Sequence, residues 1–191
     1  GQALDVYQKM FQVSLEERDQ VLKPLAQSGN EAVGSMGDDT PMAVLSSRER
    51  PLYDYFRQKF AQVTNPPIDP LREAIVMSLE VDLGGEANLF EETEAHARRT
   101  SLTSPVLSQG KFESILALHE SDLRVQIIDA TYDPGDIDLK TALTNLCLEA
   151  AAHVVGGSNV LVVSDRAFGE TRLPIHSLLA TGAIHHHLIE H

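Results

Sequence analysis

Three acidic side chains stand where the sequence predicts the ends of β-strands. Asp129 lies near the end of a predicted strand, residues 124–130, and Asp133 lies just after it. Asp165 follows the apolar run NVLVV. Ligand and catalytic groups of parallel α/β proteins gather at the carboxyl ends of strands, so these carboxylates could do acid–base chemistry or hold a hard cation. No glycine-rich phosphate loop accompanies them. The simpler interpretation is structural, in which they cap loop backbone or, as with Asp165 and Arg166, form an ion pair.

Histidines cluster near the end of the sequence, where His185, His186 and His187 are consecutive and His191 follows. Neighbouring helical residues point about 100° apart, so the three consecutive side chains cannot converge on one metal ion. His187 and His191 could share an ion from adjacent helical turns, but no HExxH arrangement is present. We therefore expect solvated or core-packed histidines and no metal site.

Two further features could indicate chemistry, but each has a simpler interpretation. The glycine-rich segment GSMGDD, residues 34–39, has neither the GK[ST] of a phosphate loop nor the GxGxxG of a dinucleotide site. The single cysteine, Cys147, lies on the apolar side of a predicted helix, which is typical of a core thiol and not of a nucleophile. We expect neither catalytic nor cofactor-binding residues in the chain.

A proline-rich segment, residues 63–70, carries three prolines among its last five residues. Proline fixes the backbone angle φ, so this segment must hold one shape. Such rigidity can end a helix, or it can present side chains at a channel wall or a domain interface. The side chains that it could present in this second use are Thr64 and Asn65, within the segment formed by Thr64, Asn65, Pro66, Pro67, Ile68 and Asp69.

The composition limits the classes of partner. The chain has 191 residues, 42% of them hydrophobic, which is enough to bury the core of one ordinary domain. Its 15 basic and 28 acidic residues give a formal net charge of -13, which repels nucleic acid and anionic lipid. A single cysteine allows no internal disulfide, and no stretch resembles a signal peptide or a membrane-spanning helix. We expect a cytoplasmic protein with neither nucleic acid nor membrane as a partner.

The amino-terminal part predicts helices separated by loops. Residues 1–30 are expected to form a helical segment with a capping box at Ser14 and Glu17, and Pro24 should kink or shorten its second helix. The elements expected next are a strand at residues 42–45, a helix that starts at residue 51, and a half-buried strand at residues 76–83.

The carboxyl-terminal part has the clearest pattern, in which strands and helices alternate. After a helix capped by Ser108, the expected elements are a strand at residues 124–130, a helix from Asp136 to Gly156, a strand at residues 160–163 and a helix at residues 174–187. The apolar stripe of the first long helix is expected to hold Leu139, Leu143, Leu146, Ala150 and Val154.

This alternation, with short glycine-bearing links, is typical of right-handed parallel crossover units. The predicted fold is α/β, an open or partial barrel-like and mostly parallel sheet with crossover helices. Residues 31–191 are its main domain, and residues 1–30 are an N-terminal helical extension.

Several sequence blocks together resemble one known family. In order along the chain they are EAVGSMGDDTPMAVLS, YFRQKFAQVTNPPIDPLREAIVMSLE, NLFEET, NVLVVSDR and LPIHSLLATGAIHHHLI. They are similar to the central domain of the large chain of bacterial and plastid glutamate synthases. The resemblance runs from Glu31 to Ile189, and residues 1–30 fit the family more loosely.

The resemblance implies a multidomain flavoenzyme that makes glutamate from glutamine and 2-oxoglutarate. In this family an amidotransferase domain releases ammonia, and a barrel domain with FMN and a 3Fe-4S cluster reduces the 2-iminoglutarate formed from that ammonia. The central domain links the two and helps shape the ammonia channel. The implied partners are these flanking domains and, through the parent enzyme, a small NADPH-oxidising subunit or ferredoxin. The plastid stroma is the implied compartment for a plant protein.

The chemistry of the family is expected outside this chain. The first residue is Gly1 and not the nucleophilic cysteine of the amidotransferase, and one cysteine cannot supply the three thiolates of the cluster. No catalytic residue of the family is therefore carried over, and the segment from Thr64 to Asp69 is the candidate for the channel or a domain interface.

Two alternatives from other functional classes remain. An independent small-molecule enzyme would bring Asp129, Asp133 and Asp165 into one enclosed polar pocket. An acidic scaffold module would show an exposed apolar patch rimmed by acidic residues.

Overall fold

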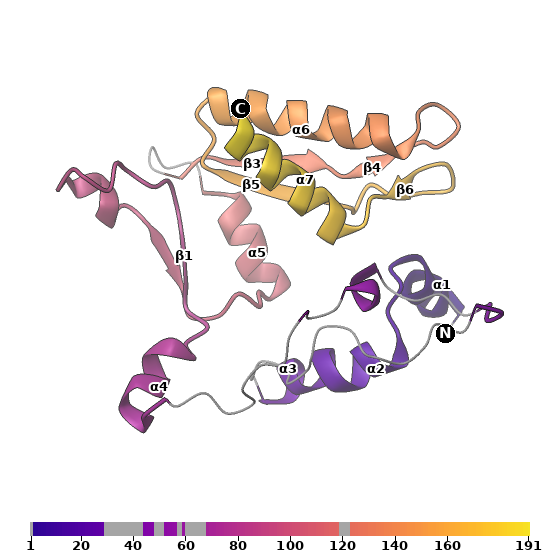
Figure 1. Ribbon diagram of the computed structural model, residues 1–191, viewed down its shortest axis with the longest axis horizontal. Coiled ribbons are helices and arrows are strands. Elements are labelled where there is room, and N and C mark those ends of the chain that lie inside the picture. Colours follow the sequence, from indigo (N-terminus) through magenta and orange to yellow (C-terminus); the bar gives the residue numbers. More distant parts are fainter. Residues whose placement is uncertain (1, 29–43, 48–51, 57–58, 60–67, 119–122) are drawn as a thin grey trace. The chain divides into compact units, whose positions relative to one another are not determined.

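The computed structural model describes residues 2–28, 44–47, 52–56, 59, 68–118 and 123–191 (Figure 1). The chain divides into two compact units, Gly1–Thr64 and Asn65–His191. All strands of the described residues, and all acidic residues expected at strand ends, belong to the second unit.

The first unit begins with helices. Helix α1 spans Gln2–Met10, and a helical run follows in three parts, which are α2 (Leu15–Glu17), the π-helix η1 (Arg18–Leu22) and α3 (Lys23–Ser28). The predicted cap at Ser14 is confirmed, because its Oγ accepts a hydrogen bond of 3.0 Å from the N–H of Glu17.

Pro24 neither ends this helical run nor leaves it regular. The N–H of Lys23 donates to the carbonyl of Arg18, five residues back, and α3 continues to Ser28. Proline has no N–H and its ring crowds the carbonyl of the preceding turn, so a wider turn before it relieves that clash.

Two other predictions for this unit need correction. Val44 and Leu45, expected in a short strand, lie in a turn, and the helix expected from residue 51 is a 3-10 helix, η2, over Leu52–Tyr55. Most of the rest of both predicted elements lies outside the described residues. Burial, followed by a hydrogen bond with Glu17, raises the pKa of Tyr53.

The second unit begins with α4 (Pro70–Val76), followed by β1 (Val81–Leu83), the 3-10 helix η3 (Glu94–Ala97) and β2 (Thr100–Leu102). β1 and β2 pair antiparallel, with Asp82 opposite Ser101. The strand predicted for residues 76–83 is therefore correct only over its last three residues. Pro70 in the first turn and a cap before it favour a helix there, which extends to Val76.

Helix α5 (Gln109–Leu116) precedes the alternating strands and helices. β3 (Val125–Asp129) and β5 (Val160–Ser164) pair in parallel, and α6 (Leu139–Val155) connects them. β4 (Thr131–Tyr132) continues β3 and pairs antiparallel with β6 (Leu173–Pro174), and α7 (Ser177–Glu190) follows. The α/β prediction is confirmed. Within the described residues the parallel sheet has two strands, two other strand pairs are antiparallel, and no barrel closes.

The core of this unit lies between the β3–β5 sheet and the helices α6 and α7, which share one face of it (Figure 1). Ile128 is 0% exposed on that face, whereas its neighbour Ile127 is 48% exposed on the other. The buried members of the cluster are Ile128, Ala130, Ala142, Leu146, Cys147, Ala150, Ile175, Ala180 and Ile184.

The predicted starts of both long helices were too early. Asp138 and not Asp136 caps α6, and Pro174 belongs to β6, so that α7 begins at Ser177. The buried residues of α6 also lie on a side of the helix that only partly overlaps the predicted apolar stripe, because α7 packs against that side. Consequently Leu139 and Val154, expected in the core, are exposed.

Asp138 provides a pH-dependent contribution to stability. Hydrogen bonds from Thr141, first from its side chain and then from its backbone N–H, hold the pKa of the Asp138 carboxyl below its ordinary value. A folded-state pKa below the unfolded one means that the contribution is present above the unfolded pKa and is lost as the pH falls through the folded one. Asp138→Asn keeps a capping side chain that does not titrate, so it should weaken the pH dependence of stability below about pH 4.

Thermal unfolding midpoints of the original chain and of Asp138→Asn, measured between about pH 2 and pH 7, check this expectation. The difference between the two proteins should shrink at the acidic end. Curves that stay parallel over the whole range would contradict the linkage.

Among the described residues, no helix combines the length and the apolar character needed to cross a membrane.

Candidate functional site

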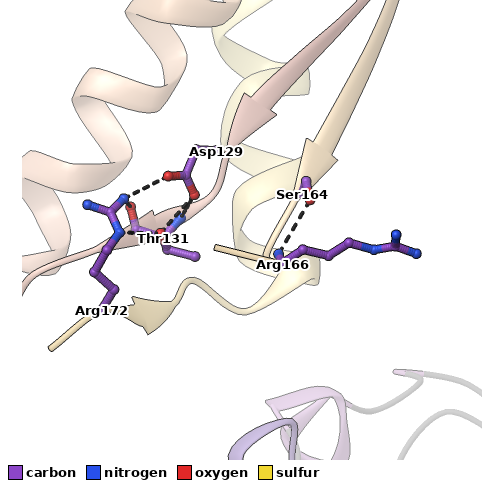
Figure 2. Close-up of polar contacts among 5 residues, drawn as sticks. All are labelled: Asp129, Thr131, Ser164, Arg166 and Arg172. Atoms are coloured by element: carbon purple, nitrogen blue, oxygen red, sulfur yellow. Dashed lines mark hydrogen bonds and ion pairs between the residues drawn. The ribbon is translucent and has the colours of Figure 1, made fainter. Parts of the chain in front are cut away.

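The end of β3 forms a polar cluster, drawn in Figure 2. Asp129 accepts two hydrogen bonds through Oδ1, from the N–H of Thr131 at 2.9 Å and from its Oγ1 at 2.7 Å. Nη2 of Arg172 donates to Asp129 Oδ2 at 2.7 Å and to the carbonyl of Thr131 at 3.1 Å, and its Nε donates to Thr131 Oγ1 at 2.9 Å. Both carboxylate oxygens of Asp129 are therefore engaged within the fold.

The Asp129–Arg172 pair holds two neighbouring elements together. Each side chain is 43% exposed, so the ion pair itself contributes at most about 1 kcal/mol. Its position is more informative, because Thr131 opens β4 and Arg172 directly precedes β6. The cluster thus fastens the β4–β6 pair to the end of β3, as the structural interpretation of Asp129 predicts.

Asp133 shapes the turn that leads into α6. Its Oδ1 accepts the N–H of Gly135 at 2.8 Å, and its carbonyl accepts the N–H groups of Asp136 and Ile137, both at 3.1 Å. This use of a short acidic side chain is typical of turns. Asp133, like Asp129, has a structural role in the described fold.

Arg166 turns away from the acidic residues and contacts helix α5. Its Nη2 donates to Gln109 Oε1 at 3.1 Å, and its guanidinium carbon lies 5.2 Å from the centroid of the Phe112 ring. Its backbone N–H donates to Ser164 Oγ at 3.4 Å (Figure 2). Arg166 and Asp165 both lie within the described residues, and no ion pair joins them. The ion pair expected between these two residues is therefore not found. Arg166 instead ties α5 to the end of β5.

A pocket of about 300 Å³ gathers part of the predicted set beside β3 and α6. Asp129, Asp133 and Arg172 line it, and Asp165 does not, so the three carboxylates of the independent-enzyme alternative do not meet there. Asn145 and Glu149 also line it, and sequence reasoning missed both. Their spacing of one helical turn on α6 is the signal that could have found them.

The histidines lie on α7 and at its end. The rings of His185 and His186 meet edge to face with centroids 5.4 Å apart, and those of His187 and His191 are 4.7 Å apart. In the part of the chain that the structure describes, no group of three histidine, cysteine, aspartate or glutamate side chains is arranged to hold a metal ion. His176, which sequence reasoning did not single out, caps α7 through its Nδ1.

Cys147 belongs to the buried core cluster, as predicted. Burial raises the pKa of its thiol, which disfavours the thiolate that nucleophiles and metal ligands need. Iron–sulfur clusters are held by several cysteine thiolates, and the sequence has one cysteine. The residues of this chain therefore do not fit such a cluster.

Two of the candidate channel or interface residues lie within the described residues. Ile68 is half-buried. Asp69 caps α4, because its Oδ1 accepts the N–H groups of Leu71 at 3.0 Å and Arg72 at 2.9 Å. The other candidates, which are Thr64, Asn65, Pro66 and Pro67, lie outside the described residues.

Comparison with known proteins gives one consistent family. The family model of the glutamate synthase central domain matches residues 6–191. A chloroplastic ferredoxin-dependent glutamate synthase of Oryza sativa subsp. japonica is 46% identical over 189 residues, which are 96% of this chain and 12% of that protein. The glutamate synthase [NADPH] large chain of Azospirillum brasilense is 44% identical over 184 residues, covering 95% of this chain and 12% of that protein.

A third relative also matches nearly the whole of this chain. The glutamate synthase [NADH] of Schizosaccharomyces pombe is 41% identical over 184 residues, which are 94% of this chain and 9% of that protein. The chain thus spans about a tenth of the length of the curated relatives it matches. These matches confirm the resemblance carried by the sequence blocks.

Proposed function

Because the chain belongs to the glutamate synthase central domain family, we propose that it serves as the non-catalytic central domain of a glutamate synthase. The parent enzyme makes glutamate from glutamine and 2-oxoglutarate. The domain links the amidotransferase domain, which releases ammonia, to the FMN and iron–sulfur domain, which consumes it, and it helps form the ammonia channel between them. The observation that carries the proposal is a family match over residues 6–191.

The uses of the acidic residues support a structural role for this domain. Asp69 caps a helix, Asp129 accepts hydrogen bonds from Thr131 and Arg172, and Asp133 holds a turn. Each of these carboxylates uses at least one of its oxygens for a hydrogen bond within the fold. These uses support a domain that works by positioning its neighbours.

In this proposal the cofactors FMN and the iron–sulfur cluster belong to another domain of the parent enzyme, where they supply its redox chemistry. Cys147, buried in the core, is the single cysteine that this chain could offer. Reducing equivalents reach the parent enzyme from a small NADPH-oxidising subunit or from ferredoxin. Its compartment is the cytoplasm, or the plastid stroma in a plant.

The channel can be tested in the full-length enzyme by placing tryptophan at position 64 or 65, as Thr64→Trp and Asn65→Trp. A bulky side chain in the ammonia route should lower glutamine-dependent glutamate formation by roughly tenfold. Glutamine hydrolysis and synthesis from added ammonia should stay within about twofold, because neither active site is altered. The measurement is the ratio of these three rates, together with ammonia released into solution.

Asp69→Asn is the matched control in the same segment. Asparagine caps helices about as well as aspartate, so this variant should keep all three rates. A tryptophan variant whose three rates fall together, or whose coupling is unchanged, would contradict a channel at these residues. Hydrolysis of glutamine by residues 1–191 alone would contradict the absence of an active site.

A further inference from the structure

The carboxyl end of α7 brings two histidine rings together. His187 and His191 are four residues apart, and the N–H of His191 donates to the carbonyl of His187 at 3.2 Å. The helical spacing therefore continues to His191, and it places the two side chains on one face of adjacent turns. Their ring centroids lie 4.7 Å apart, with the ring planes inclined by 58°. The two rings are thus neighbours that do not stack face to face.

The distance between these rings fits two ligands of one metal ion. A metal–nitrogen bond of about 2.0–2.1 Å in the plane of the ring places each ring centroid about 3.2 Å from the ion. Bond angles of about 90–109° between two such ligands then separate the centroids by about 4.5–5.2 Å. The observed 4.7 Å lies within this range. A small rotation of the side chains is therefore enough to direct one nitrogen of each ring at a shared ion.

The surroundings of the pair favour a cation. The last carbonyl groups of a helix have no partners within the helix, and they form the negative end of its dipole. Helix α7, Ser177–Glu190, contains neither lysine nor arginine, and the chain as a whole has a formal net charge of -13. His187 is half-buried and His191 is exposed, so an ion can reach the pair from solvent.

The ligand chemistry selects the class of metal. Imidazole nitrogen suits Zn²⁺, Ni²⁺ and Cu²⁺, whereas Mg²⁺ and Ca²⁺ prefer oxygen ligands. Among the described residues, no third histidine, cysteine, aspartate or glutamate joins the pair. Water would complete the coordination, so the ion would be held less tightly than in zinc sites with three or four protein ligands.

We propose that His187 and His191 form a two-ligand chelate for a divalent cation of the Zn²⁺, Ni²⁺ and Cu²⁺ class, which clips the last turn of α7. The expectation of no metal site rested on the divergence of three consecutive histidines and on the absent HExxH arrangement. Neither argument applies to two ligands one turn apart. The chelate goes beyond the proposed function and does not depend on it, because both ligands belong to this chain.

Calorimetric titration of the full 191-residue chain with ZnCl₂ tests the chelate, at about pH 7.5 where imidazole is mostly neutral. Excess Mg²⁺ in the buffer occupies carboxylate sites, which prefer hard cations. His191→Ala and His187→Ala should each weaken Zn²⁺ binding by about tenfold or more, because the second ligand of a chelate acts at high effective concentration. His185→Ala is the matched control on the same helix and should stay within about twofold of the original chain.

Unchanged Zn²⁺ affinity in His187→Ala and His191→Ala, or an equal loss in His185→Ala, would overturn the proposal. Circular dichroism of each variant separates loss of the metal from loss of the helix. His191 is exposed at the helix end, so His191→Ala keeps the test decisive even if His187→Ala unfolds the helix.

Electron paramagnetic resonance with one equivalent of Cu²⁺ gives an independent readout, since each bound imidazole nitrogen splits the signal. Coupling to two nitrogens in the original chain, which falls to one nitrogen in His187→Ala or His191→Ala, supports the chelate. Coupling that neither substitution changes would place the ion elsewhere and overturn it.

Discussion

Leu146→Ala is expected to lower the free energy of unfolding of the second unit by about 2–5 kcal/mol. Leu146 is 3% exposed and lies in the core cluster formed by α6, α7 and the sheet. Removing its side chain takes away buried apolar contacts and leaves a cavity that the rigid surroundings fill only in part. Urea unfolding of the chain, followed by circular dichroism, measures the loss as a lower midpoint with an unchanged slope.

Leu148→Ala is the matched control, two residues along the same helix. Leu148 is 56% exposed, so its truncation should cost about 0.5 kcal/mol or less. Both variants make the same chemical change, so their helix propensities change equally. Equal losses for the two variants would contradict the orientation of α6.

The second large effect is expected from the opposite change, Ala150→Leu. Ala150 on α6 and Ala180 on α7 are both 0% exposed, and such small side chains allow close approach of two helices. A leucine at position 150 would force the helices apart or into strained side-chain conformations, at a cost of about 1–3 kcal/mol. The same urea titration measures this cost.

Ala152→Leu supplies the control for that experiment. Ala152 is exposed on the same helix, and leucine forms helices nearly as well as alanine, so this variant should stay within about 0.5 kcal/mol of the original chain. If Ala150→Leu were also neutral, the contact between α6 and α7 would be looser than the buried cluster indicates.

The elements that sequence reasoning placed well are those with strong local signals. The apolar runs of β3 and β5, and the helix between them, follow from patterning within a few residues, and glycines mark the end of α6. Gly157 has φ +92°, a conformation in which other residues are strained. The serine caps at Ser14 and Ser108 were equally local and are confirmed.

The elements that it missed depend on contacts between distant residues. The antiparallel pairs β1–β2 and β4–β6 each join segments of two or three residues, too short to show a period. The buried stripe of α6 depends on α7, which packs beside it. The mixed apolar and polar composition around Val76 fits a strand or a helix, and the cap at Asp69 decides for the helix.

In the candidate site, too, local features could be predicted from the sequence and contacts between distant residues could not. The positions of Asp129 and Asp165 at strand ends could be predicted, because the strands could. The long-range contacts of the two arginines at the site could not be predicted. Arg172 is 43 residues from Asp129, and Arg166 reaches Gln109 across 57 residues, so no local pattern records either contact. The family assignment came from the resemblance of whole sequence blocks, and the family match confirms that resemblance.

The parallel pairing of β3 with β5 also sets an order of events during translation. The two strands are joined by contacts across 35 residues, as between Arg124 and Asn159. At roughly 5–20 residues per second, the ribosome needs on the order of seconds to deliver β5 after β3 has emerged. Helix α6 lies between them and forms from local contacts, so it is available first. The nascent β3 therefore depends on α6 to cover Ile128 until its partner strand arrives.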